Sequence, residues 1–220
     1  MAEGAAARPR LNRGRVVQAA VALADAGGLD ALSMRELAQQ LGVVPMALYK
    51  HVAGKDELLD LMIDCVFDEV QVSPSGDWRA RLRARYAAMR AALARHPWAV
   101  GRMETAAPGP ANLRHHNAVL ACLRSDAGLD FRTAVHAYSA LDSYLYGFAL
   151  QERTLTGDLP AEARRRGRAE AERNASAAAD YPYLVEVMVE LSRTGYEFSQ
   201  EFEFGLGLIL DGIERLRPEA

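Results

Sequence analysis

Between positions 33 and 52 the chain reads Ser33-Met34-Arg35-Glu36-Leu37-Ala38-Gln39-Gln40-Leu41-Gly42-Val43-Val44-Pro45-Met46-Ala47-Leu48-Tyr49-Lys50-His51-Val52. Ser33 is a favoured helix N-cap, and Glu36, three residues later, completes a capping box. Gly42 suits the left-handed turn that ends a helix, and Pro45 is favoured near the start of the next helix. The segment therefore predicts two short helices joined by a tight turn, which is the form of a helix-turn-helix that places its second helix in the DNA major groove.

The residues of this motif divide into a small apolar core and an outward face. The predicted core is Leu37, Ala38, Leu41, Val43, Leu48 and Val52. The candidates for DNA contact are Ser33, Met34, Arg35, Pro45, Met46, Ala47, Tyr49, Lys50, His51 and Lys55. We expect Arg35 at a guanine edge and Met46 with Ala47 at thymine methyl groups. The hydroxyl, cationic and imidazole groups of the set are expected at phosphates, where they set register.

Charge is distributed unevenly along the 220 residues, which carry a net charge of −3. Residues 1–52 contain six cations and four acids, so the excess of acids lies in the rest of the chain. The only two lysines of the sequence are Lys50 and Lys55, at the end of the motif and just beyond it. A slightly basic head on an acidic body is typical of a protein that touches an anionic polymer at one end.

The first residues add four arginines to this head, Arg8, Arg10, Arg13 and Arg15. Two interpretations stay open. The arginines form an arm that reaches the minor groove or meets phosphates, or they belong to a basic tail in solvent.

Cysteine content and hydropathy predict a cytoplasmic protein without a membrane partner. Cys65 and Cys122 are too few for a disulfide framework or a metal site, so we expect two buried thiols in a reducing compartment. The N-terminus has no apolar segment of the signal-peptide kind, and the longest apolar run, residues 204–210, is too short to span a bilayer.

Apolar residues recur at three- and four-residue spacing, which predicts an all-α fold. Besides the two motif helices, we expect helices at about residues 12–26, 55–70, 78–95, 111–125, 131–154, 183–193 and 197–216. Residues 1–54 are expected to form a three-helix DNA-binding domain with an arm at 1–11. Residues 55–220 are expected to form a larger helical effector-binding and dimerisation domain, with a mobile insertion at about 156–180.

Residues 12–60 resemble the DNA-binding domain of the tetracycline-repressor (TetR) family. The resemblance rests on Arg35, Leu37-Ala38, Leu41-Gly42-Val43, residues 48–52, and Lys55 with Leu58-Leu59-Asp60. The segments 137–140, 202–206 and 212–214, together with Gly147, are similar to the dimerisation and last helices of the tetracycline repressor. This resemblance implies a bacterial homodimer with a DNA-binding head and a body that binds a small effector.

The predicted dimer interface is a twofold four-helix arrangement of residues 131–154 and 197–216 from each subunit. Its candidate residues are Tyr138, Leu141, Leu145, Phe202, Leu206, Ile209 and Ile213. The last helix is apolar on more than one face, so it must be buried by another element.

The effector site departs from that of the tetracycline repressor. Met103, Ala107 and Ser143 stand at positions where that repressor has polar metal or drug ligands, as do Gln71 and Gln151. We therefore expect a small apolar or aromatic effector, no cofactor and no magnesium–tetracycline chelate. The candidate pocket residues are Gln71, Arg85, Met89, Trp98, Met103, Val119, Ser143, Tyr146 and Gln151, and core packing is the alternative for each. His115-His116 is expected to be solvent-exposed rather than a metal pair, because adjacent residues do not share a helix face.

The sequence thus predicts a ligand-controlled transcriptional repressor that binds a palindromic operator with its two recognition helices about 34–36 Å apart. Effector binding would favour a second conformation, and the coupling would be reciprocal. Activation of transcription and non-specific DNA packing are the alternatives. An all-α enzyme is the remaining possibility, but no nucleophile–base pair, phosphate loop or metal spacing is present.

Overall fold

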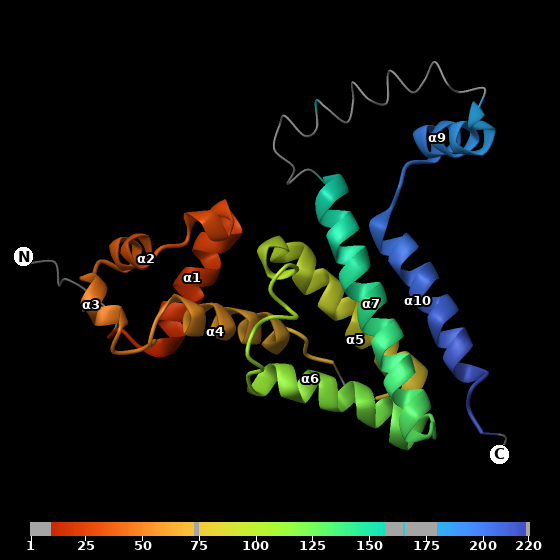
Figure 1. The fold of residues 1–220 in the computed structure, drawn as a ribbon, viewed down its shortest axis with the longest axis horizontal. Helices are drawn as coiled ribbons and strands as arrows, with labels where there is room; N and C mark the ends of the chain where they lie inside the picture. The colour runs from red at the N-terminus through yellow and green to blue at the C-terminus, as the bar shows by residue number, and fades with distance from the viewer. Residues whose placement is uncertain (1–9, 73–74, 157–164, 166–179, 219–220) are drawn as a thin grey trace, which may run out of the picture. The chain divides into compact units, whose positions relative to one another are not determined.

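The structure, a computed structural model, describes residues 10–72, 75–156, 165 and 180–218, and all the regular structure of these residues is helical (Figure 1). The α-helices are α1 Arg13–Gly27, α2 Met34–Leu41, α3 Pro45–Leu48, α4 Lys55–Asp68, α5 Trp78–Arg95, α6 Pro110–Ala121, α7 Phe131–Thr156, α9 Pro182–Thr194 and α10 Phe198–Glu214. Short 3₁₀ turns occupy Leu29–Ala31 and Pro97–Ala99, and a π-helical turn, Cys122–Asp126, follows α6. The all-α prediction is confirmed.

Two of the predicted segments lie largely outside the described residues. They are the arm at 1–11, of which residues 10 and 11 are described, and the insertion at 156–180. Within the described residues, α3 is shorter than the usual recognition helix, because it ends at Leu48 and continues as turns to His51. Val44, which precedes it, supplies no side-chain cap.

The chain divides into two compact units. The first contains Met1–Gln71 and Arg95–Asn117, and the second contains Val72–Ala94 and Ala118–Ala220. The first unit is therefore larger than the three-helix domain expected at residues 1–54, because α4 packs against α1 and the segment after α5 joins them. The predicted boundary between the DNA-binding and effector-binding domains at residue 54 stays a prediction. The first compact unit extends beyond that residue.

The ends of α2 follow the predicted local chemistry. The Ser33 hydroxyl accepts a hydrogen bond from the Glu36 backbone N–H at 3.1 Å, which satisfies one of the unpaired donors of the first turn. Gly42 adopts the left-handed conformation, with φ 66° and ψ 37°, and its N–H reaches the carbonyls of Ala38 and Gln39. These two residues fix the length of α2 and the sharp turn into α3.

The core of the first unit is built around α1. Its buried face carries Val16, Val17, Ala20, Val21 and Ala24. Four of the six predicted core residues of the motif are buried, but Leu41 and Val43 are only half-buried.

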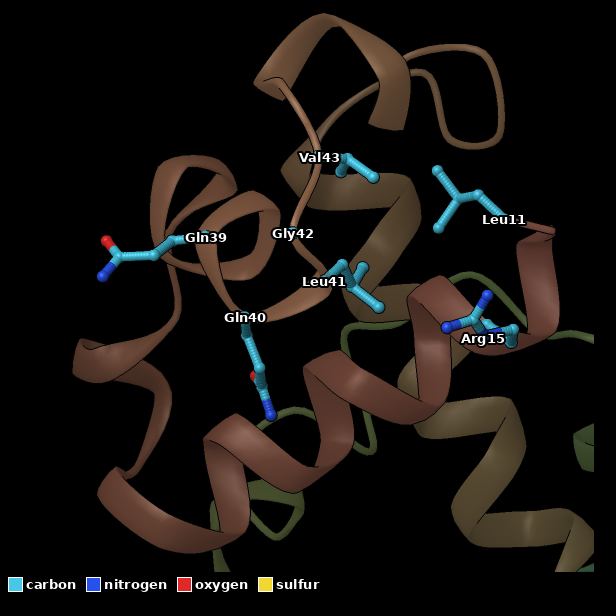
Figure 2. Close-up of a pocket in the computed structure, with 7 residues that line it drawn as sticks. All are labelled: Leu11, Arg15, Gln39, Gln40, Leu41, Gly42 and Val43. Atoms are coloured by element: carbon cyan, nitrogen blue, oxygen red, sulfur yellow. The ribbon is translucent and has the colours of Figure 1, made fainter. Parts of the chain in front are cut away.

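Leu41 and Val43 are incompletely covered because they line a surface hollow of about 390 Å³ between the start of α1 and the end of α2. Figure 2 shows Leu11, just before α1, facing Val43 across this hollow. Arg15, Gln39, Gln40 and Gly42 complete its lining.

A row of aspartates on α4 holds the chain between residues 107 and 114. Asp60 accepts a hydrogen bond from the Ala107 N–H at 3.0 Å. Asp64 accepts from the N–H groups of Ala111 and Asn112 at 2.9 and 2.8 Å, so it caps the first turn of α6 from another helix. Asp68 pairs with Arg114 at 2.7 Å. The i, i+4, i+8 spacing of these carboxylates on one helix is a signal that sequence analysis could have used.

Replacing Asp64 by alanine is expected to lower the free energy of unfolding by about 1 kcal/mol, because two N–H groups at the start of α6 lose their acceptor. Asp68→Ala is the matched control. Asp68 and Arg114 form an ion pair in which both side chains are exposed, so the expected loss of stability is below about 0.5 kcal/mol. Urea unfolding of both variants measures the difference, and equal losses would contradict the capping role of Asp64.

In the second unit, α7 and α10 lie side by side (Figure 1). The buried residues of α10 are Phe202, Leu206, Leu210 and Ile213, which share one helix face. On the facing side, Leu141 and Leu145 of α7 are fully buried. Arg90 of α5 donates two hydrogen bonds to the Glu152 carboxylate of α7, at 3.0 and 2.5 Å. These bonds join α5 to the packed helices α7 and α10.

Candidate nucleic-acid interface

The turn and first residues of α3 form an exposed surface on the first unit. The exposed fractions of Val44, Met46 and Tyr49 are 68%, 71% and 46%. Pro45 and Lys50 are exposed, and Ala47 and His51 are half-buried. All the predicted contact residues of α3 are therefore at least partly accessible, whereas Leu48 is buried beneath them.

Helix α2 adds its first turn to this surface. Arg35 is exposed and Met34 is half-buried. Ser33 is exposed, but its hydroxyl already caps α2, so it is held in place by the Glu36 N–H. Arg35 thus projects from a turn whose backbone is fixed, which is the preorganisation that a bidentate base contact requires.

The two lysines have different surroundings. Lys50 is exposed in the turn that follows α3. Lys55 donates from Nζ to the carbonyl oxygen of Leu32 at 2.9 Å, which ties the start of α4 to the residue before the α2 cap. An ammonium has three donors, so Lys55 retains donors for a phosphate while it holds the entry to α2.

Glu57 is a residue of this region that sequence analysis missed. One of its carboxylate oxygens pairs with Arg13 of α1, and the other accepts from the Ala53 N–H. Glu57 is the third residue of α4, where an acid reaches back to backbone N–H groups, so its position was a usable signal. The contact holds Arg13 on the head, which removes it from the proposed arm. Arg10 is exposed, and Arg15 lines the hollow.

The nine predicted effector residues are divided between the two units. Gln71, Trp98 and Met103 belong to the first unit and the other six to the second. Met89, Trp98, Met103 and Val119 are buried, Arg85 and Tyr146 are half-buried, and Gln71, Ser143 and Gln151 are exposed. The role of these nine residues as effector contacts stays a prediction.

Trp98 has a polar partner in the head. Its indole N–H donates to Asp25 of α1 at 2.7 Å, and the same carboxylate lies 2.7 Å from Nδ1 of His96. The other ring nitrogen of His96 lies 2.8 Å from Glu69, which also pairs with Arg95. Burial alone would raise the pKa of Glu69, but the hydrogen bonds from Arg95 and His96 outweigh it and lower that pKa. This cluster anchors the segment after α5 to α1 and α4.

A buried carboxylate lies inside the second unit. Asp142 of α7 accepts from the Tyr86 hydroxyl at 2.7 Å, and Tyr138 also donates to it. Burial, followed by the charge of Asp142, raises the pKa of both tyrosines well above the usual value. Both hydroxyls therefore stay protonated donors at neutral pH.

The predicted dimer residues lie mainly inside the protomer. Leu141, Leu145, Phe202, Leu206 and Ile213 are buried against the chain itself, while Tyr138 and Ile209 are half-buried. The role of those five side chains in a dimer stays a prediction, and they have little surface left to bury against a partner. The reason is helix phase: α10 uses its Phe202–Ile213 face for its own α7, and its opposite face carries Phe204 and Leu208.

The histidine pair is also placed differently from the expectation. His115 is buried and His116 half-buried, and their rings pack against Phe67 with centroids 5.2 and 5.4 Å from it. Solvent exposure is therefore wrong for His115. In the parts of the chain that the structure describes, no group of three or more His, Cys, Asp or Glu side chains is arranged for a metal ion.

The cysteines match the expected apolar thiols only in part. Cys122 is buried, whereas Cys65 is half-buried. Burial raises the pKa of both thiols, which keeps them protonated. None of the described helices combines the length and apolar character needed to cross a bilayer.

Comparison with known proteins covers both units. Residues 16–62 match the bacterial regulatory proteins of the tetR family, and residues 72–217 match the tetracyclin repressor-like C-terminal domain. The transcriptional repressor DrrR1 of Streptomyces coeruleorubidus is 38% identical over 95% of this chain and 79% of its own length. A class C tetracycline repressor of Escherichia coli is 28% identical over 94% of this chain and 93% of its own length.

Solved structures show the same similarity in three dimensions. The TetR family protein ActR of Streptomyces coelicolor, in complex with actinorhodin, superposes with a TM-score of 0.76 at 29% identity. The superposition covers 96% of this chain and all of ActR. With an exposed helix-turn-helix on one compact unit and both family domains matched in order along the sequence, this chain belongs to the TetR family of transcriptional regulators.

Proposed function

We propose that this protein is a homodimeric repressor that binds a palindromic operator through α2 and α3 and is released by a small-molecule effector. The observation that carries the proposal is the exposed surface of Arg35, Met46 and Tyr49 on a turn fixed by Ser33 and Gly42. Arg35 and the apolar side chains of α3 meet base edges, and Tyr49, Lys50, His51 and Lys55 meet phosphates. Regulation of this kind takes place in the bacterial cytoplasm.

The effector that we propose is small and apolar or aromatic. Buried Met89 and Val119 supply apolar surface, and the hydroxyls around Asp142 supply polar groups inside the second unit. Met103, where the tetracycline repressor has a metal ligand, is buried in the first unit. A thioether at that position favours apolar contact over magnesium, which prefers oxygen ligands. The complex of ActR with actinorhodin supports a small-molecule effector as a class.

The path from effector to DNA in this proposal runs through α6. This helix contributes residues to both units, and Asp64 and Asp68 of α4 hold its first turns. A displacement of α6 on effector binding would therefore be passed to α4, and Lys55 and Glu57 at the start of α4 hold the motif. The effector would favour one of two conformations only by the difference in its affinity for them.

The dimer face that we propose is the exposed apolar side of α10 together with exposed residues of α7. On α10 the exposed fractions of Phe204 and Leu208, one helical turn apart, are 68% and 58%. On α7, Val135 and Leu150 are exposed apolar side chains. A second copy of the same helices would cover these residues in a four-helix arrangement, and homodimers are typical of this family.

Leu208→Ala is expected to raise the dimer dissociation constant about 10²-fold to 10³-fold, because a twofold interface loses the truncated apolar contact, about 1.5–2 kcal/mol, twice. Leu113→Ala on α6 is the control, since its exposed fraction of 57% is nearly the same but it lies in the first unit. Sedimentation equilibrium over a range of concentrations measures both constants. Equal constants for the two variants would place the interface elsewhere.

The first test of the function is binding of the purified protein to fragmented genomic DNA of its source at near-physiological salt. A sharp palindromic motif beside a few genes is the expected result, and those genes would indicate the effector class. Diffuse binding that falls steeply with salt would instead support DNA packing.

Repression and activation are distinguished by transcription from the selected promoter. A repressor lowers transcription when it is added and an activator raises it. If every compound that binds the body left operator affinity unchanged, the effector switch would be wrong, because the coupling free energy between the two sites would be zero.

A further inference from the structure

The turn before α3 and the start of that helix, residues 43–48, carry exposed apolar side chains. Residues 43–48 read Val-Val-Pro-Met-Ala-Leu, so six consecutive side chains lack a nitrogen or oxygen atom. Val44 and Met46 are 68% and 71% exposed, whereas Leu48 of the same segment is buried in the core. Apolar side chains that lie together on an exposed surface are typical of an interaction site, and here they lie on the element proposed to meet DNA.

Two backbone positions of this turn have no N–H available for a base. Pro45 has no N–H, and the Ala47 N–H donates to the Val44 carbonyl at 2.9 Å. The exposed side chains at the start of α3 carry only hydrocarbon and thioether groups. Among the groups that the four bases expose in the major groove, the thymine 5-methyl is the apolar one, and the rest are hydrogen-bond donors and acceptors.

We propose that Val44 and Met46 read thymine methyl groups, which makes Val44 a specificity residue in addition to the helix residues that follow it. The inference rests on the proposed operator binding by α2 and α3. It assigns hydrogen-bonded base reading in this part of the motif to Arg35, the exposed guanidinium at the start of α2. Each half-site then holds at least two thymines whose methyl groups lie against the turn, beside a guanine that faces Arg35.

The test replaces thymine by uracil in the operator obtained from the genomic selection, one position at a time and symmetrically in both half-sites. Uracil keeps the Watson–Crick edge and the O4 acceptor and removes only the methyl group. Loss of one buried methyl corresponds to about a fourfold change in affinity, so a symmetric replacement is expected to weaken binding about 15-fold. Uracil at positions outside the half-sites is the control and should change little.

Protein variants assign the sensitive positions to residues. For Val44→Ala the ratio of thymine to uracil affinity should fall toward one at one position of the half-site. For Met46→Ala it should fall at a different position. Val44→Ile keeps a branched apolar side chain and should keep the ratio. Leu113→Ala, a truncation of another exposed apolar side chain, on α6, should also keep it at every position.

The outcomes separate this inference from the function on which it rests. If the thymine operator is bound tightly and uracil changes nothing, the methyl reading is wrong and operator binding stands. If uracil weakens binding but Val44→Ala and Met46→Ala keep the full ratio, other residues read the methyl groups and the assignment is wrong. If the thymine operator itself is not bound above random DNA, the proposed function fails.

Discussion

Arg35→Ala is expected to weaken operator binding by about 30-fold to 10⁴-fold and to reduce the preference for the operator over random DNA. A bidentate contact from arginine to a guanine edge contributes about 1–3 kcal/mol of discrimination, and a homodimer makes it twice. Arg35 is exposed at the second position of α2, and the Ser33 cap fixes the turn from which it projects. In the proposed complex the side chain would therefore reach the groove with little loss of backbone entropy.

The measurement is a salt titration of binding to operator and to random DNA. Arg193→Ala on α9 is the matched control, because it removes the same charge from an exposed position in the second unit. If Arg35 read a base, its variant would lose operator affinity far more than random-DNA affinity. If both variants lost affinity equally, or if Arg35→Ala lowered both kinds of binding alike, Arg35 would be a phosphate contact at most.

The DNA-binding motif could be predicted closely because its signals are local. Ser33, Gly42 and Pro45 each act within a few residues, through capping, the left-handed turn and the fixed φ of proline. The structure confirms the cap and the turn. Val44 is not among the DNA contacts predicted from the sequence. Its exposure is known only from the structure, because an apolar residue before a proline can be either buried or exposed.

The larger body was predicted less well because its determinants are contacts between distant residues. Leu206 and Phe204 are both apolar residues of one helix, and the sequence does not say which of two apolar faces meets the chain's own α7. In the same way, His115 looks like a solvent histidine until α4 brings Phe67 against it. Periodicity gives the existence of a helix, but its phase relative to partners depends on the packing of the other helices.

Gly205→Ala is expected to lower the free energy of unfolding by about 1–3 kcal/mol, although alanine is the better helix former. A Cβ at this position would meet Tyr144 of α7, with Cζ of that ring only 2.7 Å away. The ring cannot retreat cheaply, because it stacks on Phe202 with centroids 5.3 Å apart and its hydroxyl donates to the Phe202 carbonyl at 3.1 Å. The absence of a side chain at Gly205 therefore leaves the space that the Tyr144 ring occupies against α10.

Gly207→Ala is the matched control on the same helix. There the new Cβ would lie 3.6 Å from Arg83, an ordinary van der Waals contact, so the variant should gain about 0.5–1 kcal/mol from the lower entropy of its unfolded state. Urea unfolding of both variants at one fixed protein concentration keeps the contribution of dimerisation constant. The two substitutions are thus expected to shift stability in opposite directions.

A double-mutant cycle with Tyr144→Ala tests the cause of the difference. Removing the ring costs stability by itself, but it also removes the atoms that the new Cβ would meet. In that background Gly205→Ala should become neutral or stabilising, which gives a coupling energy of about 1–3 kcal/mol between the two positions. A loss of the same size with and without Tyr144 would mean that the substitution acts against something other than α7. The close approach of α7 and α10 inside one protomer would then not be the reason for the glycine.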